Sequence, residues 1–305
     1  MKFLRSRRAR LGVPATALAI TTAIGLTTFA NGGADATQVR GGHTTRPGEV
    51  LGAPETAHTK ASGDVRWILP GPRRLDPNIF GTPDQPLGFE EGVGVPLDDR
   101  NTTPDGTAYT TTKSPTPFSD NWAQITGRGE AVVLDRTARA GDSTRDRIHD
   151  VYTFTSPDGA HRYRVETTRP LSRLPDHENF GGVGLNVAMH GRTGIGTKLM
   201  PQFISFITYW GVADLYVDGQ KVANDRFVHV MTAERSRDIE GDYSLGFDED
   251  VDPNSVHTHL ILPPIRVTDQ GPVDSPVPTG FTLPNGMEQP FLHIMYEQVN
   301  ELRGT

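Results

Sequence analysis

Two Asp-Gly pairs, each lying between two runs of alternating apolar and polar residues, restrict the fold more than any other feature of the chain. The first is Asp158-Gly159, which separates residues 151–155 from residues 162–166. A two-residue turn needs positive φ, which glycine adopts at low cost, so this pattern predicts a β-hairpin. The cross-strand neighbours that it predicts are Phe154 with Tyr163 and Tyr152 with Val165.

The second pair, Asp218-Gly219, separates residues 207–217 from residues 221–231. A tight turn at this position predicts a second hairpin, in which apolar residues face each other across the strands. The neighbours that it predicts are Leu215 with Val222 and Trp210 with Phe227.

Further strand patterns recur at residues 131–134, 183–189, 243–247, 256–262 and 291–296. The 33 Gly and 24 Pro among 305 residues exclude a long helical bundle, because interior Gly and Pro destabilise helices. The absence of cysteine excludes a disulfide scaffold and a thiolate metal site. The sequence therefore predicts an all-β protein, an antiparallel β-sandwich or barrel of lipocalin-like or jelly-roll-like form, with an extended N-terminal arm.

The N-terminus has the layout of a secretory signal peptide over residues 1–36. Five basic residues occur among the first ten, residues 11–30 carry no charge, and Ala34-Asp35-Ala36 fits a small-residue cleavage site. Ser6-Arg7-Arg8 partly resembles a twin-arginine export signal, but Arg10 stands where such signals carry an apolar residue, so the ordinary export route is favoured. We expect a secreted or extracytoplasmic protein with no integral membrane span after cleavage.

The mature chain divides into three parts by composition. Residues 37–64 have few bulky apolar side chains and are expected to form a flexible linker. Residues 65–116 contain short apolar stretches separated by prolines, which predicts an extended Pro-rich arm. Residues 117–305 carry most of the strand patterns and are expected to form the β-rich main domain.

Histidines in the predicted strands are the most informative polar residues. Side chains two positions apart point to the same face of a strand, so His257 and His259 project together. His229 shares a face with Phe227 and Met231, and His293 shares one with Glu297. Neutral imidazole is a good ligand for Zn, Cu, Ni or Fe, so these four histidines form a candidate metal site if their strands line one sheet or barrel interior.

Glu297 and His190 are the candidate proton-transfer groups or further ligands beside these histidines. Trp210, Phe227 and Met231 form a candidate binding surface for an apolar or sugar-like ligand, because aromatic side chains can stack on flat molecules. Strand histidines and aromatic residues are also common as ordinary core residues, which is the alternative interpretation of both groups.

Several motifs fail on inspection. Residues 191–198 lack the Gly-Lys pair of a phosphate-binding loop, since Thr197 separates Gly196 from Lys198, and a turn after a strand is favoured. The acidic run at Asp248, Asp250 and Asp252 departs from the EF-hand pattern. With 30 basic and 37 acidic residues the net charge is −7, and no nucleic-acid partner is expected.

Three functions remain open. The leading hypothesis is a metal-dependent enzyme or metal-binding protein built on the strand histidines, acting on a small-molecule ligand or substrate. The second is a metal-free, lipocalin-type protein whose cavity is lined by Trp210, Phe227 and Met231. The third is an envelope-associated structural module, which requires exposed and scattered strand histidines.

Overall fold

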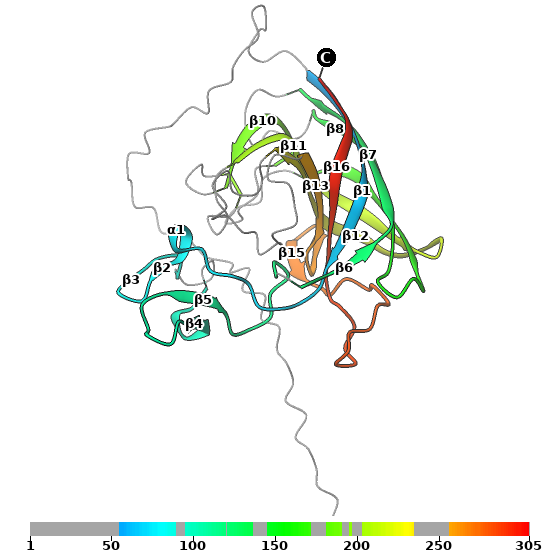
Figure 1. Cartoon of the computed structure of the whole chain (residues 1–305). Helices are drawn as coiled ribbons and strands as arrows, with labels where there is room; N and C mark the ends of the chain where they lie inside the picture. The colour runs from blue at the N-terminus through cyan, green and yellow to red at the C-terminus, as the bar shows by residue number, and fades with distance from the viewer. Residues whose placement is uncertain are drawn as a thin grey trace, which may run out of the picture.

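The structure is a computed structural model that describes residues 55–89, 95–119, 121–136, 145–171, 181–190, 195–196, 203–234 and 256–304. Antiparallel strands make up nearly all of its regular structure (Figure 1). Its strands are β1 (Glu55–Ile68), β2 (Gly81–Thr82), β3 (Gln85–Pro86), β4 (Arg100–Thr102), β5 (Tyr109–Thr112), β6 (Trp122–Ile125), β7 (Gly127–Asp135), β8 (Arg147–Thr155), β9 (Arg162–Pro170), β10 (Val183–Met189), β11 (Phe203–Val217), β12 (Gln220–Glu234), β13 (Val256–Leu262), β14 (Ile265–Thr268), β15 (Gly271–Asp274) and β16 (Leu292–Gly304). Two short helices accompany them, α1 (Pro77–Phe80) and the 3-10 helix η1 (Leu97–Asp99).

Eight strands close into a barrel in the order β1, β7, β8, β9, β11, β12, β13, β16. Each pairs antiparallel with the next, and β16 pairs with β1 to close the ring. The expected antiparallel barrel is therefore confirmed. Because each barrel strand pairs with the next barrel strand along the chain, the connectivity is up-and-down rather than that of a sandwich or jelly roll.

The barrel begins earlier in the chain than the composition predicted. β1 starts at Glu55 and is paired along both edges, with β16 on one side and with β7 and then β6 on the other. The linker expected over residues 37–64 was therefore wrong for residues 55–64, and the arm expected from residue 65 was wrong for residues 65–68. Alternating apolar side chains in β1 are sparse before Val65, so pairing with both neighbours fixes this strand more than its own sequence does.

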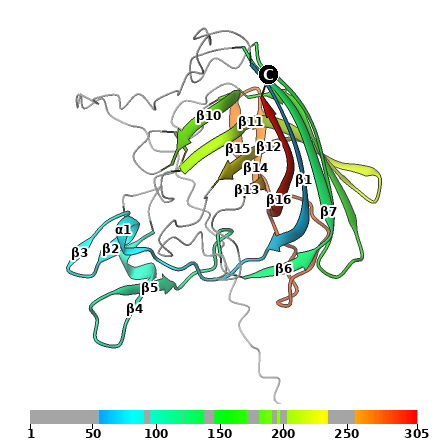
Figure 2. The same ribbon diagram turned by 45° about the horizontal axis from the view of Figure 1, so that its top comes forward.

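The middle of the expected arm forms a small lobe of α1, η1 and the hairpins β2–β3 and β4–β5, which lies beside the barrel near β6 (Figures 1 and 2). Buried Arg100 holds the lobe together. Its guanidinium donates to the carbonyls of Phe80, Leu87, Gly88 and Val95 and lies over the rings of Phe80 and Tyr109. Such a planar, five-donor group can satisfy several loop carbonyls at once.

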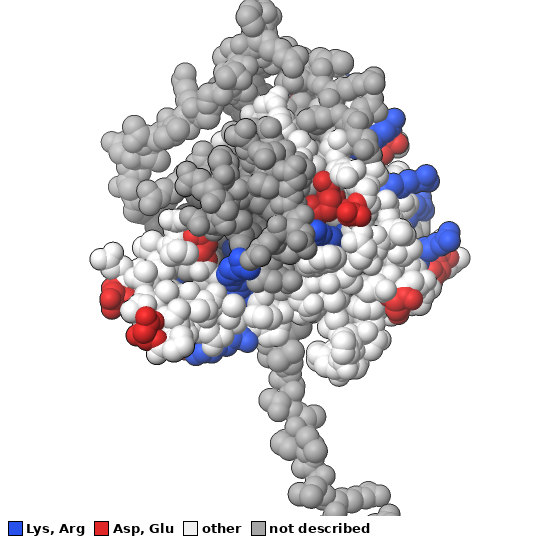
Figure 3. Space-filling model, viewed as in Figure 1, with Lys and Arg blue, Asp and Glu red and all other residues white. Residues whose placement is uncertain are grey.

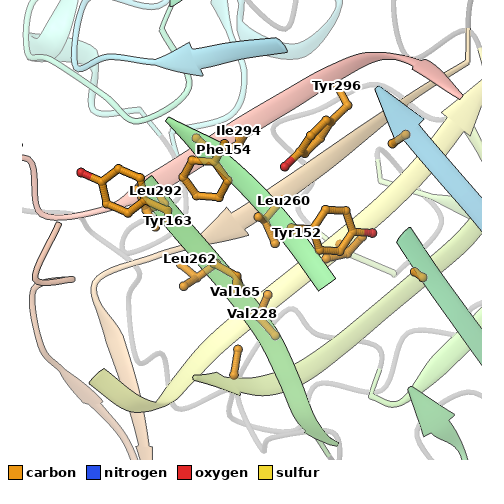
Figure 4. Packing of buried hydrophobic residues seen from close by; sticks show 14 of the residues in the cluster. Tyr152, Phe154, Tyr163, Val165, Val228, Leu260, Leu262, Leu292, Ile294 and Tyr296 are labelled. Carbon is orange, nitrogen blue, oxygen red and sulfur yellow. The ribbon is translucent and has the colours of Figure 1, made fainter. Parts of the chain in front are cut away.

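Aromatic and aliphatic side chains together fill the barrel interior (Figure 4). Trp67 packs edge-on against Phe154, Tyr163 and Phe281, with ring centroids 5.8, 5.2 and 5.5 Å away. Phe281 comes from the segment between β15 and β16, where the Thr279 carbonyl accepts a hydrogen bond from the Tyr163 hydroxyl at 2.7 Å. Offset and edge-on ring pairs of this kind add to the stability gained from apolar burial.

The first hairpin has the predicted register. β8 and β9 pair Phe154 with Tyr163 and Tyr152 with Val165, and the two rings of the first pair stack at 5.1 Å with an interplanar angle of 10°. Gly129 of β7 is the cross-strand neighbour of Tyr152 and leaves space for its ring, because a Cβ at position 129 would lie 2.3 Å from a ring carbon of Tyr152.

The second hairpin turns at Asp218-Gly219 as predicted, but its register was wrong beyond the first two pairs. Leu215 pairs with Ala223 instead of Val222, and Trp210 pairs with His229 instead of Phe227. Irregularities near Leu215 insert two extra residues into β12, where Asp225 has a φ of 54°. An even insertion preserves the side-chain faces, so Trp210 still shares its face with Phe227.

A buried carboxylate organises one part of the interior. Asp150 of β8 accepts hydrogen bonds from the backbone and hydroxyl of Thr167, both at 2.6 Å, and from the Tyr209 hydroxyl at 2.5 Å. Burial raises the pKa of Asp150 above its usual value, although these donors act in the opposite direction. Burial also raises the pKa of Tyr209, so its hydroxyl remains a donor.

Outside the barrel, the face seen in Figure 3 carries basic and acidic side chains close to one another over the barrel wall. On the hairpin strands, Lys221 lies 2.5 Å from Asp214, and Arg164 contacts Glu166 and lies over the Tyr216 ring. Exposed pairs of this kind contribute little to stability. The two ion pairs show that the outer face of β9, β11 and β12 near these residues is exposed to solvent.

Replacing Phe154 by alanine tests the interior packing. The side chain is 3% exposed and contacts Trp67 and Tyr163, so the free energy of unfolding should fall by about 3–5 kcal/mol. Val222, which is 41% exposed, provides the control, and Val222→Ala should change stability by less than about 0.5 kcal/mol. Urea denaturation measures both values, and equal losses in the two variants would contradict this packing.

Asp150→Asn tests the buried carboxylate. A carboxyl whose pKa is raised by folding adds stability at pH values below its unfolded pKa, and this contribution is lost as pH rises through the folded value. The stability of the wild type relative to Asp150→Asn should therefore decrease as the pH rises from 4 towards 8.

Asp158 provides a control of opposite sign, because the hydrogen bond from Ser156 lowers its pKa. Relative to Asp158→Asn, the wild type should lose stability as the pH falls below about 4, so the pH series is extended to that acidic range for this pair. Urea denaturation at each pH gives both differences, and a flat difference for Asp150→Asn would contradict the assignment.

Candidate functional site

The strand histidines lie on the outer face of the barrel, and they are buried. In β13, Leu260 belongs to the interior cluster, so the flanking His259 and Ile261 point outward. By the same alternation His257 points outward from β13 and His293 from β16. The exposed fractions of His257, His259 and His293 are 0%, 1% and 1%. These three side chains therefore share the outer face of one sheet and do not line the barrel interior.

A second apolar cluster surrounds them on this outer face, and we call it the outer cluster. Its members are Ile68, Leu171, Met189, Trp210, Val212, Phe227, Met231, Ala233, Ile265, Val267 and Met295. Because the barrel interior packs against the opposite face of the same strands, β12, β13 and β16 are buried on both sides. Imidazoles in such a layer are removed from water.

The register of β12, β13 and β16 arranges the outward side chains in rows. Met231, His259 and Met295 form one row, and His229, Ile261 and His293 form the next. Side chains that face each other in such rows have Cβ atoms about 5 Å apart. The row arrangement therefore places His259 diagonally next to His293.

His259 and His293 are in direct contact. Nδ1 of His259 lies 3.0 Å from Nε2 of His293, and the ring centroids are 5.3 Å apart. Nδ1 of His293 lies 3.0 Å from the carbonyl oxygen of Pro117, which can only accept, so this nitrogen is the donor. In the neutral ring Nε2 of His293 is then the acceptor, and its lone pair faces His259.

The protein environment keeps His293 neutral. Burial lowers the pKa of His293 to about 4, against the opposite effect of the bond to the Pro117 carbonyl. The ring of Phe118 lies edge-on at 5.5 Å on the other side. At neutral pH the imidazole therefore presents an unprotonated nitrogen in an apolar setting.

A carboxylate lies at the next row along the same strands. Oε2 of Glu297 is 3.8 Å from Nδ1 of His257, and Oε1 is 2.9 Å from Nε of Arg66. The guanidinium of Arg66 also lies over the Trp122 ring, 4.2 Å from its centroid. Both charged side chains are under a tenth exposed. The guanidinium of Arg66 thus compensates the charge of the Glu297 carboxylate inside the protein. The ring centroids of His257 and His259 lie 6.0 Å apart.

His229, the fourth predicted ligand, has different neighbours. Its ring stacks on Trp210 with centroids 4.5 Å apart, and its Nδ1 is 3.1 Å from the Tyr209 carbonyl. Ile261 lies between His229 and His293 in the row. His190 follows β10 at a turn closed by its backbone N–H and the Ile195 carbonyl, 2.6 Å away.

Trp210, Phe227 and Met231 belong together in the outer cluster, with exposed fractions of 3%, 4% and 1%. Their neighbours in sequence, Tyr209 and Val228, point into the barrel. These three residues therefore lie on the outer face of the barrel wall and not in its interior, and ligand binding by them stays a prediction.

Arg66, Trp122 and Pro117 are parts of the site that the sequence did not reveal. Arg66 was assigned to the arm, and only the β1–β16 pairing places it opposite Met295. The Pro117 contribution is a backbone carbonyl, for which side-chain patterns carry no signal. Several predicted features lie outside the described residues, namely the signal peptide, the linker over residues 37–54, the strand at 243–247, the acidic run at Asp248, Asp250 and Asp252, and most of the expected turn at residues 191–198.

Within the described ranges, no three His, Cys, Asp or Glu side chains are arranged as a group that could hold a metal ion. No helix in this part of the chain is long and apolar enough to cross a membrane. Comparison of the chain with protein-family models, with curated proteins and with solved structures gives no match.

The buried ion pair generates a prediction on stability. Glu297→Gln removes the charge that compensates the guanidinium of Arg66, so the free energy of unfolding should fall by about 3–5 kcal/mol. Glu130→Gln is the control, because Glu130 accepts from His58 at an exposed position and should contribute less than about 1 kcal/mol. Chemical denaturation of both variants at pH 7 measures these changes. A fall of less than about 1 kcal/mol in the free energy of unfolding of Glu297→Gln would contradict a stabilising role for the Arg66–Glu297 pair.

Proposed function

We propose that the protein binds a transition-metal ion at the His259–His293 pair, with His257 and Glu297 beside it. The observation that carries this proposal is the 3.0 Å contact between Nδ1 of His259 and Nε2 of His293. Two nitrogens bound to one tetrahedral ion at about 2.05 Å lie about 3.3 Å apart. A small movement of either ring would therefore let an ion replace the shared proton.

The second nitrogen of His293 supports the same interpretation. Metal-binding histidines usually donate their other ring N–H to a carboxylate or carbonyl, which fixes the ring and directs its lone pair. The Pro117 carbonyl occupies that position for His293. The lowered pKa of His293 keeps the lone pair available at neutral pH.

The candidate ions are Zn, Cu, Ni and Fe, for which imidazole is a common ligand. If the protein is an enzyme, a bound ion would polarise a substrate oxygen or activate water or O₂. Glu297, held by Arg66, is the proton-transfer candidate beside the pair. His229 is outside this proposal because Trp210 and the Tyr209 carbonyl are its neighbours.

Elemental analysis tests the proposal. Residues 37–305, secreted without an affinity histidine tag and purified without chelator, should contain close to one equivalent of a transition metal. His259→Ala should lose that metal because it removes half of the pair. His161→Ala, which removes a third-exposed imidazole bonded to Asp218, should retain it.

A folded wild type with no metal, after incubation with each candidate ion, would overturn the proposal. That result would favour a metal-free ligand-binding protein, with the stacked Trp210–His229 pair as the first surface to examine. The structural-module hypothesis required exposed and scattered strand histidines, whereas His257, His259 and His293 are buried next to one another.

A further inference from the structure

Two methionines flank His259 in the register of the sheet. Met231 of β12 pairs with His259, and Met295 of β16 pairs with His259 on the other side. Met295 is also two residues from His293 on the same strand, so it shares a face with both members of the pair. Met231 and Met295 are 1% and 0% exposed and belong to the outer cluster.

Thioether sulfur is a soft donor, and soft donors select Cu(I) over hard and borderline ions. Zinc in proteins is held instead by thiolate, imidazole and carboxylate groups. The chain has no cysteine, and no three His, Cys, Asp or Glu side chains in the described ranges form a metal-binding group. The strand register places donors of a different type, the thioethers of Met231 and Met295, in the same row as His259.

Charge also favours a monovalent ion. The imidazoles and thioethers are neutral ligands, and the nearest carboxylate, Glu297, already compensates Arg66 at 2.9 Å. The cost of transferring an ion from water into an apolar layer rises with the square of its charge, so a divalent ion costs about four times as much as a monovalent one.

We propose that the metal is Cu(I), bound by Nδ1 of His259, Nε2 of His293 and the sulfur of Met295, with Met231 on the opposite side of His259. This inference rests on the proposed function, because it uses the same histidine pair. It goes beyond it by naming the ion and by assigning methionine as a ligand.

Competition titrations test the assignment. The purified protein is titrated without oxygen against a chromophoric Cu(I) chelator, and separately with Zn(II) against a zinc indicator. Met295→Leu removes the sulfur and keeps nearly the same volume. Its Cu(I) affinity should fall about tenfold or more, while its Zn(II) affinity should stay within about twofold of the wild type.

Two methionines serve as matched controls. Met189→Leu removes a thioether buried in the outer cluster but located on β10, away from the His259 row, and Met287→Leu removes one that is 41% exposed. Both should bind Cu(I) like the wild type. X-ray absorption of the Cu(I)-loaded wild type should show sulfur in the first coordination shell, and Met295→Leu should lose that contribution.

The outcomes separate the two proposals. Wild-type Cu(I) affinity in both Met295→Leu and Met231→Leu would overturn the methionine assignment and leave the histidine pair as a metal site. A wild type that binds Zn(II) but not Cu(I) would do the same. Loss of Cu(I) only in Met231→Leu would overturn the role of Met295. A wild type that binds neither ion would overturn both proposals.

Discussion

The antiparallel pairing of β1 with β16 is the interaction on which the rest of the structure depends. It joins the first and last strands of the barrel and so removes the two open edges that an eight-stranded meander would otherwise expose. The same register places Arg66 opposite Met295 and next to Glu297. The pairing that closes the barrel therefore also brings Arg66 to Glu297 and Met295. Because this pairing joins distant parts of the chain, its loop-closure entropy makes it slow to form.

A barrel wall with one buried face needs alternating apolar and polar residues, and β8 and β9 follow that pattern. β13 departs from it, because its outward positions His257 and His259 are as buried as the inward Leu260. Two-sided burial removes these imidazoles from water, and His259 bonds to His293 instead. His293 in the neighbouring strand meets the same requirement through Pro117, which lies just after the small lobe in sequence.

The residue patterns predicted those features that depend on neighbouring residues in the sequence, namely the turns and the side-chain faces of the strands. Asp158-Gly159 gave the correct Phe154–Tyr163 pair, although the turn itself is centred on Pro157 and Asp158, where the Gly159 N–H donates to the Ser156 carbonyl. The Ser156 N–H donates to the His161 carbonyl, so the four-residue loop is symmetric about Asp158 and Gly159 and keeps the predicted register. At Asp218-Gly219 the extra residues in β12 moved Trp210 from Phe227 to His229, and nothing in the alternation signals a bulge. The shared faces of the histidines were predictable from their spacing of two. Their outward direction was not, because both faces of β13 are apolar enough to be buried. β1 was missed because its pairing partners, rather than its composition, make it a strand.

Stability alone gives no reason to place two imidazoles in the outer cluster. A buried polar group that loses its hydrogen bond costs about 1–3 kcal/mol, and even when it is bonded its net contribution is small. The neighbours Met231, Met295 and Ile261 show that apolar side chains fit the same rows. The low pKa of His293 shows that the layer disfavours its charged form. Buried titratable groups with shifted pKa values concentrate at functional sites, and a bound ion would repay the cost of placing this pair out of water.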